Sequence, residues 1–126
     1  AGDMEPCVFI HYSDSNIRTH TLLEALQNPL FKTFYYNQPF NDNHLRPCPM
    51  LENPERLREI VGITGAKSTD LQAPEDVETL CGRCDRYAAE WAVESEKLWN
   101  GRKHASPKTQ YYRDTPEGKA EAASKQ

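Results

Sequence analysis

Residues 80–91 read LCGRCDRYAAEW and contain two of the four cysteines of the chain, Cys81 and Cys84. Around this stretch, apolar and small residues recur at intervals of three and four, which is the period of one face of a helix. We therefore expect a single helix over 74–100, about 40 Å long at a rise of roughly 1.5 Å per residue. Two cysteines three positions apart project from the same turn of such a helix, toward the rest of the domain.

Gly82 lies between these two cysteines and lowers the helix propensity of the turn by about 1 kcal/mol relative to alanine. One use for a glycine at this position is to let a bulky group come close to the helix. Any such group would need further ligands from other parts of the chain.

The segments before this helix predict an α+β fold that is mainly helical, with the long helix last. Residues 4–12 are rich in β-forming residues and predict a short strand or the remnant of a hairpin. Two short helical segments follow, 22–28 after a threonine cap and then 30–37. An Asn-Pro start and a glycine stop predict a third helix over 53–65, and 67–73 reads as a polar loop.

The composition indicates one polar domain followed by a basic segment. The chain has 126 residues, of which 37% are hydrophobic and 27% are charged, and its net charge is −4. This charge argues against a general nucleic-acid binder, and no apolar run approaches the roughly 20 residues that cross a bilayer. Residues 101–126 contain six Lys or Arg and three acidic residues, giving +3, so residues 1–100 carry −7. We expect one domain over 1–100 and a polar, flexible tail over 101–126.

Four cysteines invite a disulfide interpretation, but a CxxC pair is more typical of metal and redox sites. No secretory h-region follows the N-terminus, so we expect the chain in the reducing cytoplasm. Three separate predicted elements supply the cysteines, which are Cys7, Cys48, Cys81 and Cys84. Four thiolates suit either a structural zinc ion or an iron–sulfur cluster. Prolines next to Cys7 and Cys48 restrict the backbone at both positions.

Other interpretations of these residues stay open at this point. Cysteines often fill space in a core, and the intervals between these four match no zinc-finger spacing that we can defend. His11 and His44 lie near Cys7 and Cys48 in the sequence and are candidates for substitute ligands or for hydrogen bonds to the ligands. Histidines in such positions are more often ordinary surface residues. The sequence contains no GxSxG, HExxH or glycine-rich phosphate loop, and we assign no catalytic residue.

Two stretches resemble a known family. GDMEPCVFIHYSDSNI, residues 2–17, is similar to the start of a SPASM domain, the C-terminal extension of many radical S-adenosylmethionine enzymes. In that family a Gly-Asp turn is followed by a Pro-Cys whose cysteine ligates an auxiliary iron–sulfur cluster. Residues 22–61, which include QPFN, LRPCP and ENPERL, are similar to the continuation in one branch of the group. The resemblance extends over 2–99 and leaves out the tail.

The resemblance implies that Cys7, Cys48, Cys81 and Cys84 ligate one auxiliary [4Fe–4S] cluster in which every iron is ligated. It also implies that the chain is the detached C-terminal part of a larger oxidoreductase, because the radical domain with its own cysteine motif and barrel is missing. S-adenosylmethionine would bind only in that missing N-terminal domain, which is the expected partner, together with a peptide or protein substrate. The chain alone is then not catalytic, and its cluster serves electron transfer or substrate binding in the parent enzyme.

Two rival functions remain. The first is a structural zinc-binding interaction module without catalysis, which would use the same four thiols. The second is a helical interaction domain with a free CxxC pair that is redox-active. The first rival predicts bound zinc without iron or sulfide, and the second predicts that Cys7 and Cys48 contribute nothing to stability.

Overall fold

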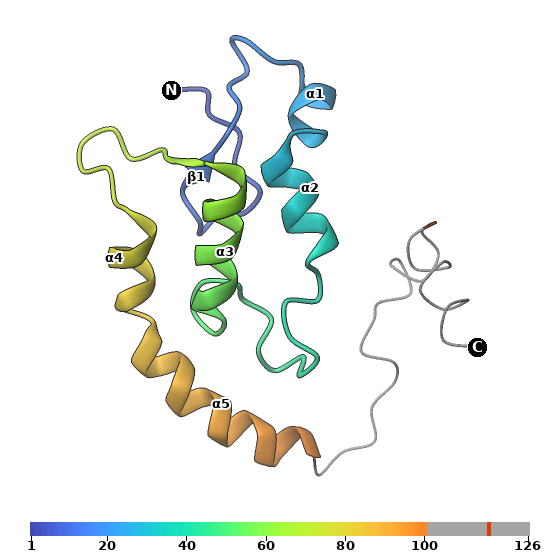
Figure 1. The fold of residues 1–126 in the computed structure, drawn as a ribbon, viewed down its shortest axis with the longest axis vertical. Helices are drawn as coiled ribbons and strands as arrows, with labels where there is room; N and C mark the ends of the chain where they lie inside the picture. The colour runs from blue at the N-terminus through green and yellow to red at the C-terminus, as the bar shows by residue number, and fades with distance from the viewer. Residues whose placement is uncertain (101–115, 117–126) are drawn as a thin grey trace.

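A computed structural model describes residues 1–100 and Pro116 (Figure 1). The expected fold class is confirmed, because helices dominate the described residues and a two-stranded antiparallel sheet lies near the N-terminal segment. The expected tail lies outside the described residues except for Pro116, and no described helix is long and apolar enough to cross a membrane. The elements in chain order are β1 (Tyr12–Ser13), α1 (Leu22–Leu26), α2 (Pro29–Tyr36), α3 (Pro54–Thr64), β2 (Lys67–Ser68), α4 (Val77–Gly82) and α5 (Asp85–Asn100).

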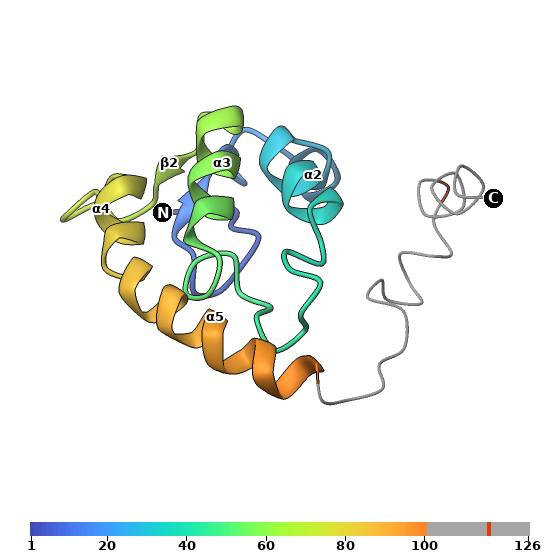
Figure 2. The same cartoon turned by 60° about the horizontal axis from the view of Figure 1, so that its bottom comes forward.

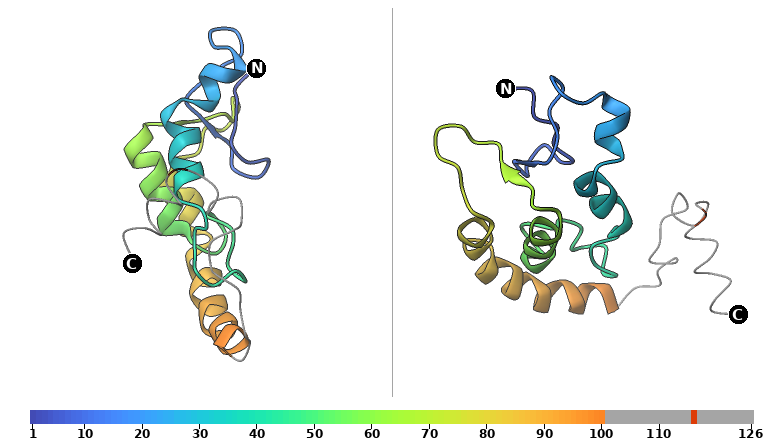
Figure 3. Two further views of the ribbon diagram at one scale, coloured as in Figure 1. Left: turned by 90° about the vertical axis from the view of Figure 1, so that its right-hand side faces the viewer. Right: turned by 45° about the horizontal axis from the view of Figure 1, so that its top comes forward.

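Three helices form a layer in which α3 lies between α2 and α4 (Figures 1 and 2). Helix α5 continues from α4 and runs past the end of this layer at which α3 begins, as the turned views in Figure 3 show. Hydrogen bonds fix it there: Trp91 Nε1 donates to the carbonyl oxygen of Leu45 at 2.9 Å. In addition, Asn43 Nδ2 donates to Glu96 Oε1 at 2.8 Å. The loop between α2 and α3, which carries Cys48, is therefore held by α5.

The core lies between α2, α3, α4 and the N-terminal segment. Leu57 and Ile60 of α3 are fully buried, and so is Leu30 of α2. They share one buried cluster with Ile10, Tyr12, Phe34, Phe40, Ala66 and Cys81. Cys81 is thus part of the hydrophobic core, and Cys7 packs against the same cluster.

The predicted N-terminal strand is wrong in extent. Only Tyr12–Ser13 forms a strand, and it pairs antiparallel with Lys67–Ser68, which the sequence assigned to a loop. Residues 7–10 instead make a tight turn closed by a bridge between Cys7 and Ile10, and the two residues at its tip are largely exposed. Strand propensity describes fit to a pleated, half-buried surface. Val8 and Phe9 at the tip of this turn have no such surface to pack on.

The single helix predicted over 74–100 is also wrong, because the chain forms two helices. Helix α4 begins after Asp76, whose side chain accepts a hydrogen bond from the backbone of Thr79. It ends at Gly82, and the Cys84 amide then donates to the Cys81 carbonyl at 2.8 Å in a tight turn. Helix α5 starts immediately afterwards and leaves in a different direction (Figure 1). A single tight turn hardly disturbs a repeat of three and four residues, so the sequence pattern does not reveal the bend.

The other helix ends agree with the sequence, with one exception. Thr21 caps α1 in a capping box with Glu24, and Gly65 ends α3 with a left-handed backbone at φ 66°. Asn53 stands in the capping position of α3, but its side chain makes no cap hydrogen bond. That side chain is turned instead toward the loop that carries Cys48.

Candidate metal centre

The fold brings three separate segments with cysteines into one neighbourhood. Cys7 and Cys48 line the same cavity, although 40 residues separate them in the sequence. Cys48 is one of the groups that raise the pKa of the Cys84 thiol electrostatically, after the larger effect of burial, so these two cysteines lie near one another. Cys81 lies one turn before Cys84, in the core against which Cys7 packs. All four cysteines are free thiols.

Cys48 lies in a turn whose backbone amides point at its sulfur. The amides of Met50 and Leu51 donate to Cys48 Sγ at 3.4 and 3.3 Å, and the Cys48 amide donates to Glu52 Oε2 at 2.8 Å. The turn thus presents two backbone donors to this one sulfur. Hydrogen bonds to sulfur are also one of the features that set the reduction potential of an iron–sulfur cluster.

The side chain of Asn53 fixes this turn through hydrogen bonds to its backbone. This side chain is fully buried, and its Nδ2 donates to the carbonyl oxygens of Arg46 at 2.8 Å and Cys48 at 2.9 Å. Asn41 in turn donates to Asn53 Oδ1 at 2.8 Å. Arg46 Nε, two residues before Cys48, is buried and has no hydrogen-bond partner among the described residues. A buried cationic donor without a partner fits a site that accepts negative charge.

The CxxC pair lies at the bend between α4 and α5. Cys81 is fully buried, and this burial raises the pKa of its thiol to about 11, while the Arg58 guanidinium acts in the opposite direction. Cys84 is half-buried, and its Sγ lies 3.8 Å from the carbonyl oxygen of Leu80. Both groups are therefore protonated at neutral pH in the metal-free chain, and metal binding would release these protons.

The four thiols do not form a ready ligand set. Within residues 1–100 and Pro116, no group of three or more His, Cys, Asp or Glu side chains is arranged to hold a metal ion. Coordination by all four cysteines would therefore require a rearrangement that brings their sulfur atoms together. Such closing on binding is usual, because metal affinity and folding are coupled in small metal-binding domains.

The two histidines near the cysteines differ in their surroundings. His11 Nδ1 lies 3.3 Å from Glu5 Oε2 and belongs to a polar cluster away from the thiols. His44 lines the same cavity as Cys7 and Cys48, and its ring lies 5.4 Å from the ring of Trp99. Of these two candidates, only His44 is thus in a position to contact a group bound by the cysteines.

The cavity beside the cysteines has a volume of about 550 Å³, and it is the feature that the sequence did not predict. Aromatic rings and prolines make up most of its wall, namely Phe9, Phe34, Phe40, Pro39, Pro47 and Pro49. The surface beside these two cysteines is therefore mainly apolar, and it opens to solvent where Phe9 is exposed. The QPFN motif was a signal for it, because all four of its residues line the cavity.

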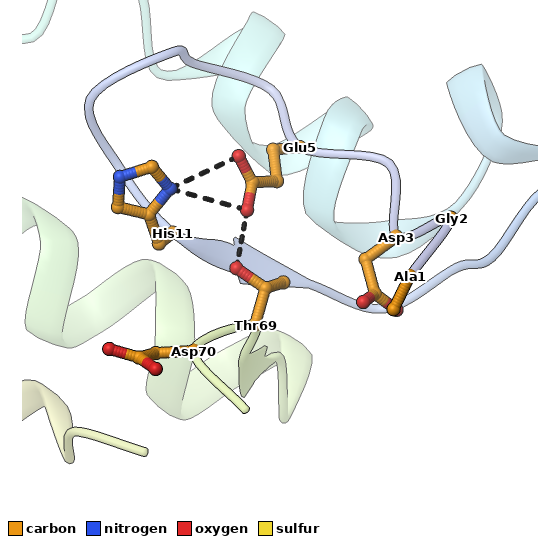
Figure 4. Close-up of a pocket in the computed structure, with 7 residues that line it drawn as sticks. All are labelled: Ala1, Gly2, Asp3, Glu5, His11, Thr69 and Asp70. Atoms are coloured by element: carbon orange, nitrogen blue, oxygen red, sulfur yellow. Dashed lines mark hydrogen bonds and ion pairs between the residues drawn. The ribbon is translucent and has the colours of Figure 1, made fainter. Parts of the chain in front are cut away.

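A second cavity, of about 420 Å³, lies at the N-terminal segment and is polar (Figure 4). The Glu5 carboxylate lies between His11 and Thr69 and accepts a hydrogen bond from the Thr69 hydroxyl. Asp70 also lines it, and backbone hydrogen bonds from Ala73 and Gln72 lower the pKa of its carboxyl. This cluster contains no thiol and joins the N-terminal segment to the loop after β2.

Comparisons with family models, with curated proteins and with solved structures found no match to this chain.

Proposed function

We propose that this domain binds an auxiliary [4Fe–4S] cluster through Cys7, Cys48, Cys81 and Cys84. The observation that carries the proposal is the Cys48 turn, which directs two backbone amides at a sulfur beside the cavity that Cys7 also lines. A space-filling cysteine needs no such turn. When bound, a cluster of this kind supplies one-electron transfer, and four thiolate ligands leave it no open position.

The surrounding residues fit a centre that carries negative charge. The positive charge of Arg58 lowers the pKa of the Cys81 thiol. Arg46 lies two residues before Cys48 in the sequence, and its buried Nε has no hydrogen-bond partner among the described residues. The amides of the Cys48 turn add two further donors. Together these groups offset the thiolate charge that burial alone would disfavour.

The parent protein in this proposal is a cytoplasmic radical S-adenosylmethionine oxidoreductase. Its N-terminal radical domain would bind S-adenosylmethionine and would be the partner of the present chain, which is not catalytic by itself. The cysteine domain would pass electrons to or from the active site or help to bind a peptide or protein substrate. The resemblance of residues 2–17 and 22–61 to SPASM domains supports this part of the proposal.

A structural zinc site is the second candidate, because the same four sulfur atoms match the tetrahedral ligand set of structural zinc. Zinc bound in this way contributes about 10–16 kcal/mol to folding in small peptides. The bend that holds Cys81 and Cys84 and the turn that holds Cys48 would then serve stability alone.

Metal analysis of the anaerobically prepared and reconstituted chain separates these functions. Iron and acid-labile sulfide in equal amounts, together with the charge-transfer absorbance of an iron–sulfur cluster, are the expected result. One zinc ion per chain without sulfide would favour the zinc module. A fully folded chain that takes up neither would reject both proposals and would favour the helical domain with a redox-active CxxC pair. In that case, replacing Cys7 and Cys48 by serine would leave stability unchanged.

A further inference from the structure

Arg58 makes the most extensive ion-pair contact of α3. Its Nη1 and Nη2 donate to the two carboxylate oxygens of Asp85 at 2.9 and 2.7 Å, and its Nε donates to Glu78 Oε2 at 2.8 Å. One guanidinium therefore binds two carboxylates, one of them in the bidentate geometry that only arginine provides.

These two carboxylates lie on opposite sides of the α4–α5 bend. Glu78 belongs to α4 and stands three residues before Cys81, whereas Asp85 begins α5 and directly follows Cys84. The CxxC segment is thus enclosed between the two residues that Arg58 holds. Arg58 of α3 therefore contacts the helix on each side of the bend.

The ion pairs of Arg58 with Glu78 and Asp85 can fix the angle between α4 and α5, but they contribute little to the stability of the fold. The side chains of Glu78 and Asp85 are 71% and 49% exposed, and exposed ion pairs contribute little to the free energy of unfolding. Arg58 itself is only 25% exposed, so its position is fixed by the packing of α3.

We propose that Arg58 is the positioning residue of the cysteine site, holding α4 and α5 at a fixed angle and thereby fixing the position of Cys81 relative to Cys84. This inference rests on the proposed function, because it assigns the ion pair a role in metal binding. Arg83, which also lies at the bend, pairs instead with Glu75 before α4 and does not connect the two helices.

The test uses the full-length chain with Arg58→Lys, Asp85→Asn and the double variant, each reconstituted anaerobically with ferrous iron and sulfide or loaded with zinc. The loss of metal to a chelator is then followed. Lysine keeps the charge but cannot bridge both carboxylates, so Arg58→Lys should lose metal about 10-fold faster than wild type. Asp85→Asn should show a similar loss, and the double variant should be no worse than either, because all three break one contact.

The control is Arg56→Lys, which lies on the same helix and pairs only with the exposed Glu59, at 3.4 Å. It should retain metal like wild type. Unfolding of the metal-free variants in urea tests for a merely structural role, and Arg58→Lys should leave the midpoint close to that of wild type. A lowered midpoint in proportion to the metal loss would overturn the proposal.

The remaining outcomes also decide the question. If wild type holds metal and Arg58→Lys holds it equally well, the positioning role is overturned and the proposed function stands. If the double variant is additively worse, the two residues do not act through one contact, and the positioning role is again overturned. If wild type holds neither iron nor zinc, both proposals fall together. Should Arg58→Lys not fold, Asp85→Asn tests the same contact from the exposed end of the pair.

Discussion

At the level of single residues, Cys48 and Cys81 are held in contrasting ways. Cys48 is surrounded by hydrogen-bond donors in a loop, and Cys81 is surrounded by apolar side chains in the core. Burial in the second environment raises the pKa of the Cys81 thiol and favours its protonated form. A metal that bound both would therefore have to displace a proton from Cys81.

We predict that Asn53→Asp weakens both the fold and the cysteine site. The change removes the two donors that hold the Arg46 and Cys48 carbonyls and places a carboxylate against them. Leaving buried groups unsatisfied in this way costs about 1–3 kcal/mol, measurable by urea unfolding. Metal retention should fall as well, because the Cys48 turn is no longer fixed. The matched control is Asn37→Asp, which loses one half-buried bond to Thr33, and an equal effect of both variants would contradict the prediction.

The stability of the metal-free chain should fall as pH rises from about 9 to about 11. Burial raises the pKa of Cys81 from 9.0 to about 11, so the folded chain holds this proton more tightly than the unfolded chain does. This difference in proton binding contributes to the free energy of unfolding below pH 9, and the contribution is lost as the pH rises toward 11. For the Cys81 thiol the free energy of unfolding changes by roughly 2–3 kcal/mol. Tyr12 acts in the same direction at higher pH, because burial raises its pKa from 10.0 to about 12.

Anaerobic urea unfolding across this pH range, with and without Cys81→Ala, measures the effect. The variant should show a flatter decline between pH 9 and pH 11, since the titrating thiol is gone. An identical pH dependence of the two chains would show that Cys81 is not the group responsible.

The four cysteines and their proline neighbours were evident in the sequence, and the residues that support them were not. Asn53 was expected to cap α3, since an Asn-Pro pair is typical of a helix start. Its side chain instead bonds to carbonyls five and seven residues earlier, a choice that depends on where the loop returns. Arg58 likewise carries no local signal, because both of its partners are 20 or more residues away.

At the level of elements, the α4–α5 bend is the decisive difference between prediction and structure. Helix periodicity identified part of the apolar face, since Cys81, Ala88 and Ser95 are all buried, but Tyr87 and Leu98 of the same repeat are exposed. It missed the tight turn at Cys84, because one such turn shifts the face too little to disturb the repeat. Strands β1 and β2 have two residues each and pair across more than 50 residues of sequence. Strands this short depend on tertiary contacts, and two residues are too few to show the alternation of apolar and polar residues that predicts a strand.

Gly82→Ala should stabilise the metal-free chain by about 0.5–1 kcal/mol, because alanine has the higher helix propensity. No atom lies within 4 Å of the position that the new Cβ would occupy. Thermal unfolding measures the change, and Gly65→Ala provides the contrast. Gly65 has φ +66°, and alanine there should cost about 1–2 kcal/mol. A Gly82→Ala variant less stable than wild type would contradict the geometry of the bend.

At the level of the whole molecule, the core and the cysteine neighbourhood are one structure. Cys81 is a core residue, Cys7 packs against the core, and the cavity beside Cys48 shares Phe34 and Phe40 with it. Closing of the thiols around a metal would therefore tighten the contact between the N-terminal segment, the Cys48 loop and the helical layer. We infer that metal binding and the ordering of these segments are coupled.

The central claim is that Cys7, Cys48 and Cys84 bind one metal centre together with the buried Cys81. The most direct measurement is the rate of alkylation of each cysteine by iodoacetamide, read by mass spectrometry on the metal-loaded full-length chain and again after chelation. Cys81 is already buried without metal, so the other three thiols carry the information. We predict that metal protects all three and that chelation exposes them together. Alkylation of Cys7 or Cys48 at the same rate with and without metal would contradict the claim.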